Sequence, residues 1–273
     1  MPLCSNAHTH CSYCDGLNTM EEMVQAALSL GFHDIGFSSH SDTGLQEPVL
    51  KDIPGYLAEI SRLGQKYAGQ ITITAGVEQD ALYPVADPGQ FSYLISSVHC
   101  LRNRDGKTWI VDHFETFQDC LEEMFGGDAM ELVRAFFELS AQSVLTYRPQ
   151  VVGHLDLVRK YNDGGRYFDE TSPAYLDAAK SAIDAIIPTG AIFEINTGGM
   201  FRHSKATPYP DIPLLRYIRD QGGRVMVNSD SHELASLAYR FPEALSIAQD
   251  AGFSSVWLLR DGVFVEEPIS ALI

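Results

Sequence analysis

The stretch Ile71-Thr-Ile-Thr-Ala-Gly-Val-Glu78 decides how the rest of the sequence is interpreted. Its β-branched residues predict a strand over residues 71–75, and a carboxylate follows where that strand ends. The same arrangement, an apolar run that leads into a potential metal ligand or buried polar residue, occurs at seven predicted strands. The residues that follow these strands are His8 and His10, His40, Glu78, His99, His154, Asn196, and Asp230 with His232.

Helical periodicity separates these strands from end to end. The expected strands cover residues 6–10, 34–38, 71–75, 93–98, 151–153, 191–195 and 224–227; the expected helices cover 19–31, 55–67, 114–125, 128–147, 173–187, 212–221 and 242–251. Strand–helix alternation predicts a parallel sheet. An open sheet places its site at one crevice, whereas a barrel gathers all strand ends around one mouth. We therefore expect an α/β barrel of about seven strands, with an eighth at 256–259 left open, as a single domain over residues 1–273.

Composition excludes several classes of protein. Of the 273 residues, 45% are hydrophobic and 20% are charged, which supplies a core and excludes disorder. Lys and Arg number 19 against 36 Asp and Glu, a net charge of −17. Such a surface repels phosphate backbones, so we expect neither long nucleic acid nor an anionic membrane as a partner. A small anionic substrate remains compatible, because bound divalent cations would offset the charge locally.

The sequence points to a cytoplasmic protein. No Lys or Arg precedes Lys51 and no apolar run reaches about 18 residues, so neither a targeting segment nor a membrane span is expected. The five cysteines, Cys4, Cys11, Cys14, Cys100 and Cys120, are an odd number that fits reduced thiols. Cys11-Ser-Tyr-Cys14 lacks the second pair of a zinc ribbon and does not open a helix, which favours spectator thiols over a metal or redox role.

Histidines concentrate at the predicted strand ends. His8 and His10 would lie on one face of a strand, because side chains alternate with period two, and both could reach one cation. Six of the nine histidines follow this rule; His33, His113 and His203 have the character of ordinary loop or surface residues. Glu78 and Asp230 occupy equivalent positions, and a buried carboxylate needs a compensating charge that a metal supplies. We therefore interpret the set as a metal cluster.

The ordered motifs resemble a known family. They are His8-Thr-His10, Tyr13-Cys-Asp15-Gly, Ser38-Ser-His40, Gly76-Val-Glu78, Ser97-Val-His99, Gly153-His154 and Ser229-Asp230-Ser-His232. Together they resemble the PHP (polymerase and histidinol phosphatase) superfamily from about Asn6 to Gly252. The stretches from Gly153 to Lys160, Glu194-Ile-Asn-Thr-Gly, Tyr209-Pro and Asn228 to His232 are similar to its histidinol-phosphate phosphatase branch. The resemblance implies a distorted TIM-like (β/α)7 barrel, the PHP fold, with its metal site at the C-terminal ends of the strands.

The resemblance also implies up to three divalent metal ions, Zn, Fe or Mn. His8, His10, Glu78 and Asp230 would hold the first; Glu78 would bridge to a second completed by His99 and His154; Asp15, His40 and His232 would hold the third. A carboxylate can bridge two cations roughly 3.5–4 Å apart, whereas an imidazole cannot. Many relatives have His in place of Asp15, with one more residue after His10, and an acidic residue in place of Ser39, so this chain departs most at the third site. An oxygen donor at Asp15 suits Mn²⁺ or Fe²⁺ as well as Zn²⁺.

The expected reaction is hydrolysis of a small phosphomonoester, which by resemblance is L-histidinol phosphate. Glu78, Asp230 and His232 are the expected catalytic residues. Arg159 and Arg202 are the expected phosphate ligands, because guanidinium groups bind phosphate oxygens bidentately, with Lys160 and Lys205 as weaker alternatives. Asp80 and Asp156 are candidate general acids, and an acidic pocket is expected for the cationic amine of the substrate.

Three rival interpretations stay open. One is a PHP phosphoesterase that acts on nucleotides or other small phosphates. Another is a metal-dependent amidohydrolase barrel, which also begins with H-x-H but usually has a bridging Lys where this chain has His99. The third is a catalytically silent PHP module that binds a partner, against which the complete set of ligands argues. Oligomeric state is not predicted.

Overall fold

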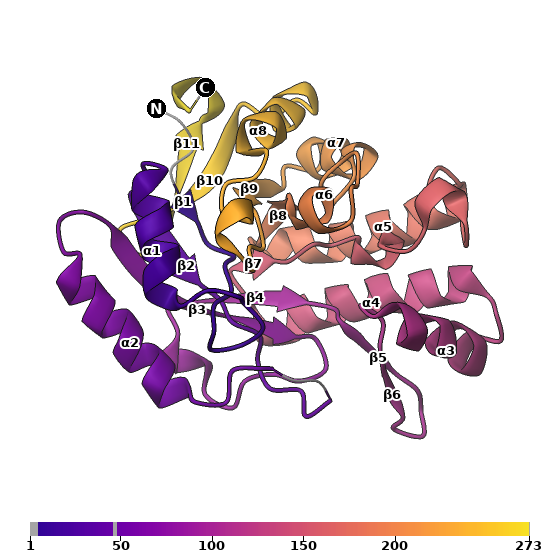
Figure 1. Cartoon of the computed structure of the whole chain (residues 1–273). Helices are drawn as coiled ribbons and strands as arrows, with labels where there is room; N and C mark the ends of the chain where they lie inside the picture. The colour runs from indigo at the N-terminus through magenta and orange to yellow at the C-terminus, as the bar shows by residue number, and fades with distance from the viewer. Residues whose placement is uncertain (1–4, 46–47, 273) are drawn as a thin grey trace.

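A curled sheet surrounded by helices makes up the computed structural model, which describes residues 5–45 and 48–272 (Figure 1). The strands are β1 (Ser5–Asn6), β2 (Asp34–Phe37), β3 (Thr72–Asp80), β4 (Tyr93–Ser97), β5 (Cys100–Arg102), β6 (Thr108–Ile110), β7 (Val151–Val152), β8 (Ile192–Asn196), β9 (Arg224–Asn228), β10 (Ser255–Arg260) and β11 (Val263–Pro268). The helices are α1 (Met20–Ser29), α2 (Ile53–Lys66), α3 (Phe114–Phe125), α4 (Ala129–Tyr147), α5 (Pro173–Ile186), α6 (Gly198–Arg202), α7 (Ile212–Asp220) and α8 (Phe241–Asp250).

Nine strands form the main sheet in the order β1-β2-β3-β4-β7-β8-β9-β10-β11. Every neighbouring pair is parallel except the hairpin β10–β11. The sheet curls until its first edge returns to β9, where Thr9 bridges Ser231 in parallel register. The His10 amide donates to the Ser231 carbonyl at 2.7 Å across this junction. Seven strands, β1 to β4 and β7 to β9, form the parallel wall that the predicted (β/α)7 barrel requires, and β10 also contributes Leu259 to the interior.

Tyr93 fills the interior of the curled sheet. Its hydroxyl donates to the carbonyl of Ala7 on the opposite side at 2.5 Å. Gly36 and Gly76 make room for the ring, since a Cβ at either would lie 2.1–2.2 Å from Tyr93 atoms. A small apolar cluster shares this layer: Ala7, Tyr93, Ile95, Val151, Ile192, Met226 and Leu259. This apolar layer forms the floor of the interior, and the polar groups at the strand ends lie together above it.

The helices pack outside the sheet over a second, larger apolar cluster. Their starts follow local sequence signals. Thr19 caps α1 in a capping box with Glu22, whose backbone and side chain both take part. Asp52 caps α2, and Ser172 caps α5 ahead of Pro173. These caps fix where each of the three helices begins.

The structure adds elements that the sequence pattern did not predict. β5 and β6 form a small antiparallel hairpin after His99, and α6 is a short helix after β8. The expected strand at 256–259 exists as β10, but it pairs with β9 and continues into β11 rather than completing an eight-stranded barrel. β1 is shorter than residues 6–10, although Thr9 still pairs across the junction.

No helix within residues 5–45 and 48–272 is long and apolar enough to cross a bilayer. The four cysteines described, Cys11, Cys14, Cys100 and Cys120, are free and buried. The fifth, Cys4, lies outside the described residues.

Candidate metal centre and active site

Nine side chains from seven places in the chain meet at the C-terminal mouth of the sheet. His8 and His10 follow β1, His40 follows β2, and Glu78 lies near the end of β3. His99 and His154 follow β4 and β7, Asp230 and His232 follow β9, and Asp15 comes from the loop before α1. All nine residues predicted as metal ligands are therefore brought together, because parallel strands end at the same edge.

The first group of potential ligands consists of His8, His10, Glu78 and Asp230. His8 Nε2 lies 3.2 Å from Glu78 Oε2 and 3.4 Å from Asp230 Oδ1. His10 Nε2 lies 3.1 Å from the same Asp230 oxygen. His8 Nε2, His10 Nε2 and Glu78 Oε2 are buried and make no hydrogen bond within the described part of the chain. Buried ligand atoms that converge on one point without forming hydrogen bonds to each other are the arrangement a cation would complete.

Glu78 faces two groups at once. Its Oε2 points to His8, to His10 and, at 2.9 Å, to His40 Nδ1. Its Oε1 lies 3.1 Å from His154 Nε2 and 3.4 Å from His99 Nε2. The second potential metal group in the structure is His40, Glu78 and His99. It contains His40 where the expected set had His154, although His154 Nε2 lies 3.3 Å from His99 Nε2. The two oxygens of one carboxylate thus face different imidazole sets, which is the geometry expected of a bridge.

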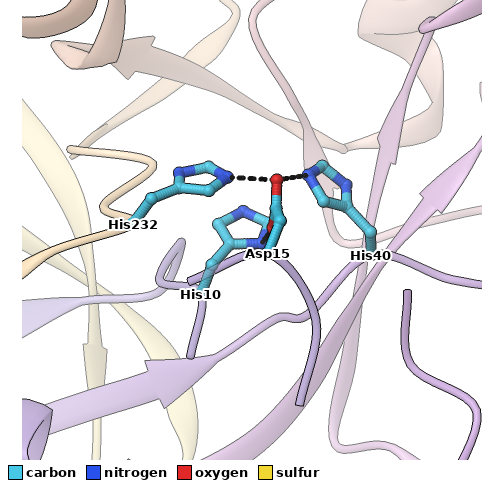
Figure 2. A group of neighbouring side chains, drawn as sticks. All are labelled: His10, Asp15, His40 and His232. Atoms are coloured by element: carbon cyan, nitrogen blue, oxygen red, sulfur yellow. Dashed lines mark ion pairs between the residues drawn. The ribbon is translucent and has the colours of Figure 1, made fainter. Parts of the chain in front are cut away.

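The third group is His10, Asp15, His40 and His232 (Figure 2). Asp15 Oδ2 lies 3.2 Å from His232 Nε2 and 3.6 Å from His40 Nε2. The expected set for this site was Asp15, His40 and His232; the structure adds His10, whose ring stacks on His232 with centroids 4.0 Å apart. His40 also borders the second group, so the three groups overlap more than the family resemblance implied.

The buried carboxylates of this cluster favour positive charge beside them. Burial would lower the pKa of His40 and of His99, but Glu78 outweighs burial and raises both to about 9. Burial would raise the pKa of Glu78, and the surrounding histidines hold it well below its usual range instead. Asp15 follows the same pattern, because His232 and His40 outweigh its burial and lower its pKa. Carboxylates that stay ionised in a buried site need cations beside them, either imidazolium groups or metal ions.

Glu194 contacts the cluster from the side of the apolar floor, and no role was predicted for it from the sequence. On β8 it lies two residues after the floor residue Ile192, on the same face. Glu194 Oε1 lies 2.7 Å from His8 Nδ1, and Oε2 accepts from the backbone N–H of His154 at 3.0 Å. This contact directs His8 Nε2 to the first group. The signal in the sequence was the alternation Ile192, Glu194, Asn196 along a buried strand.

A cavity of about 410 Å³ opens above the potential metal ligands. Besides Asp15, His40, His99, His154, Asp230 and His232, it is lined by Leu17, Asp112, His113, Leu157, Lys160, Phe201, Arg202, His203, Tyr209, Glu233 and Ser236. Apart from the potential ligands, the cavity holds two basic side chains, Lys160 and Arg202, and two further carboxylates, Asp112 and Glu233. His113 and His203 lie outside the helices and strands, as expected, and His113 is exposed, but both also line the cavity.

Arg202 lies where the sequence analysis expected a phosphate ligand. Its Nη2 donates to Asp230 Oδ2 at 2.6 Å, and its Nη1 donates to the Asp230 carbonyl at 2.5 Å. The side chain stays about 31% exposed, so it is held by Asp230 and still reaches the cavity. It belongs to the short helix α6, which begins directly after the β8 strand end.

Arg159 does not line this cavity, contrary to the expected position at the mouth. Its guanidinium is buried, with Nε 2.9 Å from Asp156 Oδ2 and Nη2 donating to the Pro208 carbonyl at 2.5 Å. Residues in the tight turn Leu157–Arg159 point in successively different directions, so the next residue, Lys160, reaches the cavity instead. Lys160 Nζ donates to Asp112 Oδ1 at 2.5 Å.

The candidate general acids also lie away from the cavity. Asp80 is buried and accepts from the backbone N–H of His99 at 2.9 Å, which holds that histidine in place. Asp156 is buried against Arg159 and accepts from the Asp211 amide. Neither carboxyl lines the cavity, so neither is placed to protonate a leaving group there.

Known proteins share both the sequence and the fold. Residues 6–198 match the PHP domain family. A probable histidinol-phosphatase of Schizosaccharomyces pombe is 26% identical over 96% of this chain and 90% of its own length. The histidinol-phosphatase of Bacillus subtilis is 26% identical over 86% of this chain and 96% of its own.

Among solved structures, the histidinol phosphate phosphatase of Lactococcus lactis, complexed with zinc, L-histidinol and phosphate, superposes with a TM-score of 0.71. It shares 19% identity and covers 97% of this chain and 100% of its own. The hisK protein of Listeria monocytogenes gives a TM-score of 0.75 at 20% identity, covering 88% and 99%. These structures share the distorted barrel, and the family match spans more than half of the sequence. The chain belongs to the PHP domain family.

Proposed function

We propose that this chain is a metal-dependent phosphomonoester hydrolase whose substrate is L-histidinol phosphate. The observation that carries the proposal is the junction of three overlapping ligand groups with a small cavity that contains Arg202. A phosphoryl group bound at this junction would lie between Arg202 and the cations of the ligand groups. The relatives named histidinol-phosphatase, which align over most of both chains, supply the substrate.

The residues present fit divalent metals. Imidazole and carboxylate groups are the ligands of Zn²⁺, Fe²⁺ and Mn²⁺, and the unpartnered atoms of His8, His10 and Glu78 face one another. We assign His8, His10, Glu78 and Asp230 to one ion, Glu78 with His99 and His154 to a second, and Asp15, His40 and His232 to a third. Metal ions at such sites supply Lewis acidity and lower the pKa of water.

The other side chains of the cavity hold the substrate. Arg202, held by Asp230, presents its guanidinium to the phosphoryl oxygens. Lys160, held by Asp112, provides a second positive charge. Both charges stabilise phosphoryl oxygens as the ester bond to the leaving group lengthens. In this proposal Lys160 takes the place expected for Arg159.

The amine of the substrate requires a carboxylate. Of the four carboxylates at the cavity, Asp15 and Asp230 belong to the ligand groups and Asp112 pairs with Lys160. Glu233, next to His232, is the one whose carboxylate has no ion pair within the described residues. We assign it to the ammonium group of histidinol phosphate.

Three broader assignments accompany the function. We propose one domain over residues 1–273, supported by the sheet that runs without interruption from β1 to β11. We propose a cytoplasmic location, in keeping with the free thiols of the four described cysteines. The proposed partner is a small phosphomonoester rather than long nucleic acid or membrane, in keeping with the net charge of −17.

Phosphate release tests the function directly. The protein, purified without chelator and supplied with Zn²⁺, Mn²⁺ or Fe²⁺, should release phosphate from L-histidinol phosphate faster than from nucleotides or sugar phosphates. Faster phosphate release from a nucleotide would contradict the proposed substrate and leave the proposed phosphomonoester hydrolysis intact. Absence of turnover on every phosphomonoester, with metals bound, would overturn the proposal.

A further inference from the structure

The Cys11-Ser-Tyr-Cys14 motif lies directly against the first ligand group. It forms a tight turn in which the Cys14 amide donates to the Cys11 carbonyl at 2.9 Å, and the Gly16 amide donates to the same carbonyl at 3.2 Å. The turn buries both thiols, with Cys11 fully covered and Cys14 only 4% exposed. Cys11 packs within the larger apolar cluster, whereas Cys14 is not a member of it.

The two thiols have different neighbours. Cys14 Sγ lies 3.4 Å from His10 Nδ1, within hydrogen-bond range for sulfur. Cys11 Sγ instead lies 3.7 Å from Ser39 Oγ. The Asp15 carboxylate is farther from His10 Nδ1, at 3.7 Å, so the thiol is the closer partner of that nitrogen. The motif therefore contains one cysteine that contacts a histidine and one that does not.

His8 provides a comparison for the contact between His10 Nδ1 and the Cys14 sulfur. A histidine that binds metal through one ring nitrogen commonly donates its other N–H to a neighbouring group, which fixes both tautomer and orientation. His8 Nδ1 has Glu194 for this purpose, and its Nε2 faces Glu78 and Asp230. His10 has the same arrangement, with Nε2 facing Asp230 at 3.1 Å and Nδ1 facing a sulfur.

We propose that Cys14 is a positioning residue for His10, through a hydrogen bond from His10 Nδ1–H to the Cys14 sulfur. This bond leaves the lone pair of His10 Nε2 directed at the first ligand group. The proposal rests on the proposed metal site and is independent of the substrate. Cys14 is not itself a ligand, since the group around Asp15 comprises His10, Asp15, His40 and His232 without it.

Cobalt(II) titration of the full chain tests this role, because the ion reports both affinity and ligand type. Cys14→Ala should lower the affinity of the tightest site about 10-fold, as loss of a partner to a ligating histidine does. Cys14→Ser keeps an acceptor atom and should recover most of that affinity. Cys11→Ala is the matched control from the same turn and should bind like the parent. The metal-free melting temperature of each variant shows whether the chain is folded.

The outcomes separate the two proposals. If the parent chain binds no cobalt, the proposed metal site fails. If the parent binds but Cys14→Ala binds equally well, or Cys11→Ala loses as much, the positioning role is wrong. A sulfur-to-cobalt charge-transfer band that disappears in Cys14→Ala would make Cys14 a ligand and overturn the positioning role as well.

Discussion

Single side chains at the mouth act through pairs of contacts, and Glu194 shows this most clearly. It accepts from His8 Nδ1 with one oxygen and from the His154 amide with the other. Glu194→Gln keeps the shape but has one acceptor atom, so one of the two donors must face an NH₂ group. We expect zinc affinity to fall about 10- to 100-fold.

Competition with a chromophoric chelator measures that affinity. Glu138→Gln, on the exposed face of α4, makes the same change of charge away from the site and should bind zinc normally. Unchanged zinc affinity in Glu194→Gln would show that the contact with His8 does not orient the ligand.

Arg202 and Arg159 separate a substrate contact from a structural one. Arg202→Ala should lower kcat/KM about 10- to 100-fold, the cost of losing hydrogen bonds to a charged group. Arg159 is buried between Asp156 and Pro208, so Arg159→Ala should mainly lower the melting temperature. Steady-state kinetics and thermal unfolding on both variants distinguish the two. The reverse pattern, with Arg159→Ala stable and catalytically impaired, would restore Arg159 to the phosphate site.

At this scale the sequence predicted which residues gather but not how they pair. Eight of the nine ligand candidates lie near or just after the end of a strand, which is a one-dimensional signal, whereas Asp15 comes from the loop before α1. The direction of a side chain within a three-residue turn is not such a signal, so Arg159 and Lys160 exchanged places. Nor did the sequence show that His10 lies between two ligand groups, because that depends on the loop that carries Asp15.

Among the elements, β2 carries a titratable group at the opposite end of the sheet from the metal cluster. Asp34 is 3% exposed and accepts from the Asp261 amide at 2.7 Å; burial raises its pKa to about 6, with Asp261, Arg260 and His33 nearby. Between about pH 4 and 6 the folded chain keeps a proton that the unfolded chain has released, so this group makes stability fall as pH rises through that window.

Asp34→Asn removes that proton exchange and keeps an acceptor for Asp261. At pH 7 the variant should be more stable than the parent by about 1–3 kcal/mol, and the difference should disappear near pH 4. Urea unfolding at both pH values measures it, with exposed Asp105→Asn as the control. A variant less stable at pH 7 would show that the negative charge of Asp34 stabilises the fold.

The elements themselves were predictable where periodicity was strong. Helices α3, α4 and α7 begin and end within a few residues of their expected positions. Asp128 and Asp211 cap α4 and α7, whereas α3 has no side-chain cap and was predicted from its apolar periodicity. The hairpin β5–β6 and strand β11 escaped prediction, since short antiparallel strands with exposed faces lack a distinctive pattern. The role of β10 depends on pairing with both β9 and β11, which no local signal specifies.

For the whole molecule, metal should act as a stabilising ligand. Any ion that binds only the folded chain raises its stability, by about 2.7 kcal/mol per site at 100 times its dissociation constant. We expect chelator to lower the melting temperature by several degrees and zinc to restore it, with more than one metal per chain by elemental analysis. A melting temperature indifferent to zinc would argue that the ligand groups do not bind it in the folded state.

Substrate choice depends on the charge of the entire cavity. Arg202 and Lys160 attract any phosphate, so preference among phosphates must come from the other end of the substrate. Glu233 lines the cavity beside His232 and would attract an ammonium group. The parent chain should therefore have a much higher kcat/KM for L-histidinol phosphate than for p-nitrophenyl phosphate, which has no cation.

Glu233→Gln should reduce the ratio of these two kcat/KM values about 10-fold or more, since a hydrogen bond to a charged group contributes about 1.5–3 kcal/mol. Its rate with p-nitrophenyl phosphate and its metal content should stay unchanged. Glu122→Gln, which makes the same charge change on exposed α3, should leave the ratio intact. A ratio that survives in Glu233→Gln would assign the ammonium group to another carboxylate of the cavity, with Asp112 the next to test.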